Sequence, residues 1–161
     1  MPKCTVTQKF PFIPSEKELD ALITGADRKM AAFLQLLKET AMRSGEAKRL
    51  EWTDIDFEKS IITLNKPEKG SLARMWRVSL NLIAMLNLLP KTSIRVFGNG
   101  SIRSYKATYT KMRKRLAFKL QNPRLNRITL HTFRHWKATQ LYHETKDPCQ
   151  KENLTFLRKH K

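Results

Sequence analysis

The chain has 161 residues, a length that suits one domain with a hydrophobic core of its own. Hydrophobic residues make up 40% of the sequence, which excludes intrinsic disorder as the default. Lys and Arg total 32 against 14 acidic residues, so the formal net charge is +18. A surface this basic repels itself unless a polyanion binds to it. Nucleic acid is therefore the leading expected partner, and an anionic membrane surface is the second.

The sequence gives no sign of a secreted or membrane-spanning protein. No apolar run approaches the length of a membrane span, and residues 1–14 contain three prolines instead of the apolar core of a signal peptide. Cys4 and Cys149 have no metal-ligand spacing and indicate no disulfide framework. We therefore expect a cytoplasmic, nucleoid-associated protein. Residues 1–14 are interpreted as an arm or linker, and residues 15–161 as one domain.

The N-terminal third is predicted to be helical. Ser15 and Glu18 have the spacing of a capping box, which predicts a helix that begins there. A second helix is predicted over residues 27–42, and a short one over residues 44–52. The apolar residues of the second helix share one face at helical spacing, which indicates a core position: Met30, Phe33, Leu34, Leu37 and Ala41.

The middle of the chain is predicted to contain strands. Residues 60–65 and 73–80 are rich in β-branched and apolar residues, and the segment between them contains Pro, Gly and charge, as a hairpin connection does. A short helix follows and stops at Pro90. Residues 91–100 are interpreted as a connection with a short strand and a Gly-rich turn.

Residues 101–120 predict a long amphipathic helix. Its apolar face comprises Ile102, Tyr105, Tyr109, Met112, Leu116 and Leu120. Its basic residues include Lys106, Lys111, Arg113, Lys114 and Lys119, without acidic neighbours at helical spacing, which favours contact with a phosphate backbone. Further helices are predicted over residues 130–144 and 150–159. The expected fold is mainly α, with one small β-hairpin or three-stranded sheet.

The segment LHTFRHWKAT, residues 130–139, contains residue types that handle phosphate. His131 and Arg134 are three apart on a predicted helix and therefore share a face. Arg can grip two phosphate oxygens, and His can transfer protons. His131 and His135 also have the spacing of a zinc pair, but the Glu of an H-E-x-x-H motif and a third ligand are missing. We therefore expect no metal and no cofactor.

Two separated boxes give the sequence its resemblance to the catalytic domain of tyrosine recombinases, the phage integrase family, and most of all to integrase-like proteins of archaea. The second box is His-x-x-Arg, met by His131 and Arg134. The resemblance covers roughly residues 12–147 and implies the DNA breaking-rejoining fold. The first box comprises Thr40, Ala41, Met42, Arg43, Glu46, Leu50, Trp52, Asp54, Ile55 and Asp56.

The resemblance implies a role for each matched residue. Arg43 and Arg134 would clamp the scissile phosphate of duplex DNA, and Glu46 would orient Arg43. Lys69 in the hairpin turn would protonate the leaving 5′ oxygen, with Lys66 as the alternative. His131 would assist proton transfer at the nucleophile. Leu157 and His160 are the candidates for a last box, with His160 as a further catalytic residue.

The family's nucleophile is a tyrosine beyond that last box, and no tyrosine of this sequence occupies the corresponding place. Tyr105 and Tyr109 fit the apolar face of a helix, and Tyr142 lies two to three turns after His131. We therefore expect a C-terminally incomplete catalytic domain that is inactive alone. The alternatives are a sequence cut short, a decayed gene, or a partner that supplies the tyrosine in trans.

The expected function is therefore DNA strand cleavage and rejoining through a 3′-phosphotyrosine, with duplex DNA as partner. Assembly into a homo-oligomer on DNA is the family expectation. No membrane and no small-molecule substrate are expected. One alternative is a non-catalytic DNA-binding remnant of an integrase, and another is a basic RNA-binding protein, although the sequence has no aromatic RNA-binding motif.

Overall fold

The computed structural model describes residues 12–145, and its N-terminal part is a set of three helices. They are α1 (Glu16–Gly25), α2 (Arg28–Thr40) and α3 (Ser44–Lys48). The predicted capping box at the start of α1 is confirmed, because the Ser15 hydroxyl accepts from the Glu18 amide and the Glu18 carboxylate accepts from the Ser15 amide. The predicted second helix is α2, which ends two residues earlier than predicted, at Thr40, and is buried along most of its length.

The predicted helix over residues 44–52 is wrong in its second half. After α3 the chain forms a 3-10 turn, η1 (Trp52–Asp54), because residues 50–52 bond to the connection that follows α4 instead of continuing the helix. The Val96 amide donates to the Leu50 carbonyl at 2.9 Å, and the Trp52 amide donates to the Ile94 carbonyl at 3.1 Å. The short strand expected within residues 91–100 is therefore a single bridge, between Glu51 and Arg95.

The sheet is antiparallel and has three strands, in the order β1 (Ile55–Asp56), β2 (Ile61–Leu64) and β3 (Arg74–Arg77). Ile62 lies opposite Ile55 on one side and opposite Trp76 on the other. The predicted hairpin is therefore confirmed, with β1 added at its edge. Helix α4 (Leu80–Asn87) follows directly, and the Ser79 hydroxyl caps its first turn.

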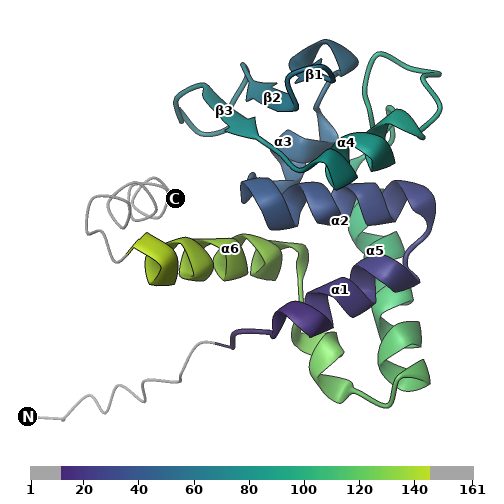
Figure 1. The fold of residues 1–161 in the computed structure, drawn as a ribbon. Coiled ribbons are helices and arrows are strands. Elements are labelled where there is room, and N and C mark those ends of the chain that lie inside the picture. Colours follow the sequence, from purple (N-terminus) through teal and green to yellow (C-terminus); the bar gives the residue numbers. More distant parts are fainter. Residues whose placement is uncertain (1–11, 146–161) are drawn as a thin grey trace, which may run out of the picture.

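The C-terminal part consists of α5 (Ile102–Lys119), the 3-10 turn η2 (Pro123–Arg127) and α6 (Leu130–Thr145). In Figure 1 the sheet lies above α2, and α5 and α1 lie below it. Helix α6 packs against α2 and approaches the end of α2 that leads to α3 (Figure 1). The expected mainly helical fold with a small sheet is confirmed. The helix predicted over residues 150–159 lies outside the described residues.

The hydrophobic core centres on α2 and gathers side chains from every layer, including Phe33, Leu37, Ile62, Leu82, Leu116 and Phe133. All five residues of the predicted apolar face of α2 are buried. The predicted apolar face of α5 holds except at its end, where Leu120 is 49% exposed because it caps the helix beyond the last packed turn.

Tyr109 and Tyr105, both on α5, allow a comparison of how a bonded and an unbonded buried hydroxyl affect stability. The Tyr109 hydroxyl donates to the Ile128 carbonyl at 2.6 Å, whereas the Tyr105 hydroxyl is buried without a hydrogen-bond partner. We expect Tyr109→Phe to lower the free energy of unfolding by about 1 kcal/mol, since one net hydrogen bond is lost. Tyr105→Phe removes only an unsatisfied group and should leave stability unchanged or higher. Urea denaturation of both variants tests this. A larger loss for Tyr105→Phe would contradict the assigned contacts.

Candidate functional site: an arginine cluster at the end of the central helix

Arg43 is placed by an abrupt end to α2. Ala41 adopts the left-handed conformation at φ 56°, which stops the helix, and the Thr40 hydroxyl donates to the Leu36 carbonyl at 2.7 Å. The chain turns and α3 begins at once, with Arg43 at its N-cap position. The Arg43 side chain is 14% exposed, so the turn holds its guanidinium close to the surface but within the fold.

Glu46, on the first turn of α3, is the buried centre of the site. Its side chain has no exposed area. It accepts from the Arg43 amide at 2.9 Å and from the Arg43 guanidinium at 3.3 Å. Arg74 of β3 donates to both carboxylate oxygens, at 3.1 and 3.0 Å. A buried carboxylate is stable only with such compensation, and here two arginines and backbone amides supply it.

The connection between β2 and β3 folds back over this carboxylate. The Glu68 amide donates to Glu46 at 3.1 Å, and the Ser71 hydroxyl accepts from Arg43 at 3.1 Å. Lys69 and Gly70 form the bend, both at positive φ (54° and 68°). Both candidate lysines of the turn, Lys66 and Lys69, are exposed. Two hydrogen bonds, from the Glu68 amide and to the Ser71 hydroxyl, therefore hold the turn against the site. The two lysines of the turn lie on the surface.

Arg134 reaches the same place from α6. Burial, together with the neighbouring charges of Arg43 and Arg74, lowers the pKa of Arg134 to about 10, against the opposing effects of Glu46 and Glu68. Arg134 remains protonated at neutral pH. It makes no ion pair within residues 12–145, although it lies among charged groups. The helix therefore holds a cation where the folded protein disfavours its charge.

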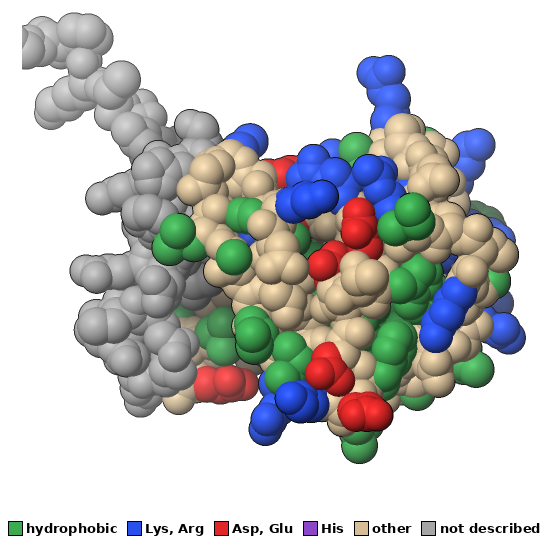
Figure 2. Space-filling view, turned by 90° about the horizontal axis from the view of Figure 1, so that it is seen from above, with side chains coloured by type: hydrophobic (Ala, Val, Ile, Leu, Met, Phe, Trp, Pro, Cys, Tyr) green, Lys and Arg blue, Asp and Glu red, His purple; other side chains and the backbone are tan. Residues whose placement is uncertain are grey.

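Positive charges outnumber negative ones at this site. Three arginines, Arg43, Arg74 and Arg134, face the one buried carboxylate of Glu46, while Glu68 pairs with Arg49 at 2.9 Å. A tetrahedral oxyanion with several acceptor oxygens, such as a phosphodiester, would satisfy the free donors. On the sheet face of the molecule, Lys and Arg side chains gather with smaller groups of acidic side chains beside them (Figure 2).

The two predicted arginines and Glu46 are thus brought together. His131 and His135, one turn apart on α6, are exposed, with ring centroids 4.3 Å apart in an edge-on arrangement. His160 lies outside the residues that the structure covers. Arg74 was not predicted as a site residue, because it occupies a strand whose pattern indicates only core and surface positions. The one sequence feature that could have indicated Arg74 is its position directly after the turn that carries the candidate lysines.

Two of the three tyrosines, Tyr105 and Tyr109, pack in the hydrophobic core. Tyr109 is 2% exposed, and burial raises the pKa of its phenol well above the ordinary value. Burial raises the pKa of Tyr105 in the same way. Both are therefore poorly suited to form a phenolate. Tyr142 on α6 is 44% exposed.

Residues 12–145 form neither a metal-binding cluster nor a membrane span. No group of three His, Cys, Asp or Glu residues in that region is placed to hold a metal ion. None of the helices there is long and apolar enough to cross a bilayer.

The fold agrees with the class that the sequence resembles. A mainly helical domain with a small three-stranded antiparallel sheet was expected for a tyrosine recombinase catalytic domain. The model of the phage integrase family matches residues 15–150. The chain belongs to the phage integrase family. A search of curated protein sequences gives no match.

Solved structures share this fold. XerA recombinase is 24% identical, with a TM-score of 0.70 over 86% of this chain and 53% of that one. The Tn1549 transposon integrase, solved in complex with transposon right end DNA, is 14% identical, with a TM-score of 0.71 over 88% of this chain and 56% of that one. The catalytic domain of bacteriophage HP1 integrase is 21% identical, with a TM-score of 0.57 over 80% of this chain and 70% of that one. The chain therefore spans about half the length of the first two.

Proposed function

We propose that this chain is the DNA-binding part of a site-specific recombinase, in which Arg43 and Arg134 hold a phosphodiester of duplex DNA. The observation that carries the proposal is the half-buried Arg134, which lies beside two other arginines and makes no ion pair with any residue from 12 to 145. A phosphate group would offset their mutual repulsion. Glu46 then positions Arg43 and Arg74 so that their remaining N–H groups point to one oxyanion.

Each matched residue has a proposed role in the cleavage reaction. Arg43 and Arg134 stabilise the charge that builds on the non-bridging oxygens of the scissile phosphate. A lysine of the β2–β3 turn, Lys69 or Lys66, gives its proton to the leaving 5′ oxygen. His131 assists proton transfer at the attacking tyrosine, and His160 is proposed as a further catalytic residue. Residues 15–161 form this catalytic unit, and several copies assemble on DNA.

The proposed partner is tested by measuring the binding of a labelled DNA duplex over a series of salt concentrations. A protein that contacts six or more phosphates should lose roughly 1,000-fold in affinity between 50 and 200 mM salt. An RNA hairpin of equal length serves as the comparison. Salt-insensitive binding, or a clear preference for the hairpin, would contradict the proposed DNA partner and would favour the RNA-binding alternative.

The chemical role of this chain is tested by incubating it with supercoiled plasmid and quenching with detergent. We expect no relaxation and no covalent protein–DNA adduct, because Tyr105 and Tyr109 are unsuited to attack phosphorus and Tyr142 lies two to three turns beyond His131 on α6. Lys66→Ala and Lys69→Ala should bind the plasmid as the wild type does, within about twofold, since a proton donor to the leaving group adds little to binding. An adduct formed by the wild type would mean that a tyrosine of this chain is the nucleophile. The lysine whose removal abolishes that adduct would then be the acid.

A further inference from the structure

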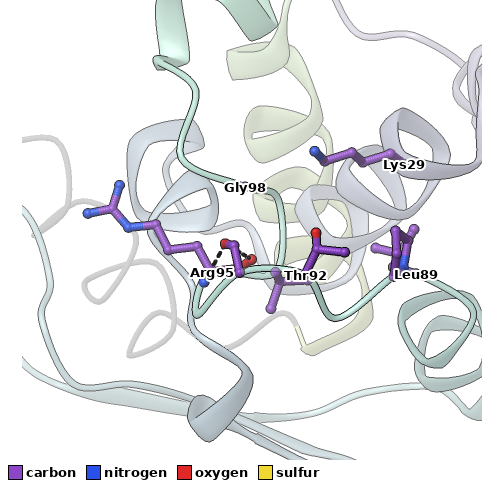
Figure 3. Close-up of a pocket in the computed structure, with 8 residues that line it drawn as sticks. Lys29, Leu89, Thr92, Arg95 and Gly98 are labelled. Carbon is purple, nitrogen blue, oxygen red and sulfur yellow. Dashed lines mark hydrogen bonds between the residues drawn. The ribbon is translucent and has the colours of Figure 1, made fainter.

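The two lysines of α2 lie in different surroundings. Lys29, in the first turn, is exposed and extends toward the Gly98 segment, while the Arg95 side chain points away from it (Figure 3). Lys38, in the last turn, has a side chain that is only 11% exposed. It lies five residues before Arg43, at the end of α2 that leads to the arginine cluster. The fold therefore encloses a basic side chain close to the site.

Two acidic residues of α1 hold the Lys38 ammonium group. It donates to the Glu16 carboxylate at 3.0 Å and to the Asp20 carboxylate at 2.7 Å. These two carboxylates are four residues apart and therefore share one face of α1. Burial opposes the charge of Lys38, but the hydrogen bonds to Asp20 and Glu16 outweigh this effect and raise its pKa above the ordinary value. Lys38 is therefore charged at neutral pH, and a second helix fixes its position.

The same ammonium group also contacts α6. It lies 5.3 Å from the centroid of the Trp136 ring, a distance at which an indole attracts a cation. Trp136 is 7% exposed, whereas every later residue of α6 up to Glu144 is at least partly exposed. Within the described part of the chain, Trp136 is therefore the last buried residue that holds α6 against its neighbours.

The contact between Lys38 and Trp136 lies close to Arg134 along α6. Trp136 follows Arg134 by two residues, and the fully buried Phe133 precedes Arg134 directly. Among the elements of residues 12–145, α6 packs chiefly against α2. Phe133 and Trp136 therefore fix the rotation of α6 about its axis at the position of Arg134. The charges of Arg43 and Arg134 act on each other, so a small rotation of α6 changes how the two guanidinium groups face one phosphate.

Helix α1 also holds the turn that leads into α6. The Glu18 carboxylate accepts from the Arg124 side chain of η2 at 2.7 Å, and the Glu18 side chain is only 12% exposed. The acidic residues of α1 therefore restrain the segment that carries Arg134 on both sides. They act through Arg124 before this residue, and through Lys38 and its aromatic contact after it.

We infer that Lys38 is a positioning residue for Arg134. Held by two carboxylates of α1, its ammonium group supports the Trp136 ring and thereby fixes the rotation of α6. Because these carboxylates already compensate its charge, Lys38 acts through Arg134 and is not itself a phosphate ligand. The consequence for binding rests on the function proposed above, in which Arg43 and Arg134 hold a phosphodiester of DNA.

The test is a double-mutant cycle on the affinity of the full chain for a labelled DNA duplex. Lys38→Met keeps the aliphatic stem that packs on Trp136 and removes the charge. It should weaken binding about tenfold in the wild type but less than about twofold in Arg134→Gln, since residues of one network are coupled. Lys38→Arg keeps the cation and should bind as the wild type does. Lys17→Gln, at an exposed position, should have the same small effect in both backgrounds.

An equal loss from Lys38→Met in both backgrounds, or no recovery in Lys38→Arg, would overturn the inference, because a general effect on charge or stability does not depend on Arg134. A measurement without DNA separates the inference from the proposed function. The Nε–H signal of Arg134 in the ¹⁵N-labelled chain, identified by its loss in Arg134→Gln, should shift in Lys38→Met and return in Lys38→Arg. If Arg134→Gln leaves DNA affinity unchanged, the proposed function fails, and an unmoved Nε–H signal in Lys38→Met would overturn the inference as well.

Discussion

Replacing Glu46 with Ala is expected to lower the free energy of unfolding by about 3–5 kcal/mol, the cost of leaving a buried charge without its partner. The carboxylate accepts from two guanidinium groups and two backbone amides, so its removal leaves Arg43, Arg74 and the Glu68 amide without their shared acceptor. Since a small domain is stable by only about 5–15 kcal/mol, this variant should be close to unfolding. Urea denaturation measures the difference.

Two further variants separate the charge of Glu46 from its shape. Glu46→Gln keeps the volume and one acceptor oxygen, so it should lose less stability than Glu46→Ala but still more than about 1 kcal/mol. Glu58→Gln, at an exposed position, should change stability by no more than about 0.5 kcal/mol. Equal, small effects at positions 46 and 58 would show that the carboxylate does not hold the cluster together.

Replacing Arg134 with Gln is expected to separate stability from binding. Because the fold disfavours the charge of Arg134, its removal should leave the free energy of unfolding unchanged or slightly higher. Affinity for duplex DNA should fall about 10- to 100-fold, since hydrogen bonds to charged groups contribute about 1.5–3 kcal/mol. Fluorescence anisotropy and urea denaturation of the same preparation measure the two quantities.

The control for this prediction is Lys17→Gln, which removes the same charge from an exposed position on α1. It should change DNA affinity by less than about threefold if the arginine cluster is the main phosphate site. If Arg134→Gln unfolds the protein while DNA affinity per folded molecule stays the same, Arg134 is a structural residue. Opposite effects of residues in one cluster, with Glu46 stabilising and Arg134 destabilising the fold, are typical of a binding site.

The helices could be predicted from the sequence because their signals are local. The Ser15–Glu18 capping box and the helical spacing of the apolar residues of α2 depend on neighbours within a few positions. Arg43, Glu46 and Arg134 were found because their boxes resemble those of a known family. The meeting of these boxes across the fold depends on the packing of α6 against α2, which no local pattern specifies.

The features that could not be predicted from the sequence all depend on contacts between residues far apart in the chain. Arg74 becomes part of the site only because β3 pairs with β2 and places its guanidinium over a glutamate 28 residues earlier. The burial of Lys48 depends on the return of the loop at Gly98, 50 residues later. The end of the predicted helix at residue 48, likewise, follows from bonds to residues 94 and 96. Charged residues whose partners lie far along the chain were therefore the least predictable.

The central claim is that Arg134 binds a backbone phosphate of duplex DNA. Its most direct test is the salt dependence of duplex binding, measured for the wild type, Arg134→Gln and Lys17→Gln between 50 and 200 mM salt, a range over which counterion release dominates. We expect the slope of log affinity against log salt to be smaller by about one for Arg134→Gln, and unchanged for Lys17→Gln. If Arg134→Gln and the wild type have the same affinity at every salt concentration, and therefore the same slope, the claim is contradicted.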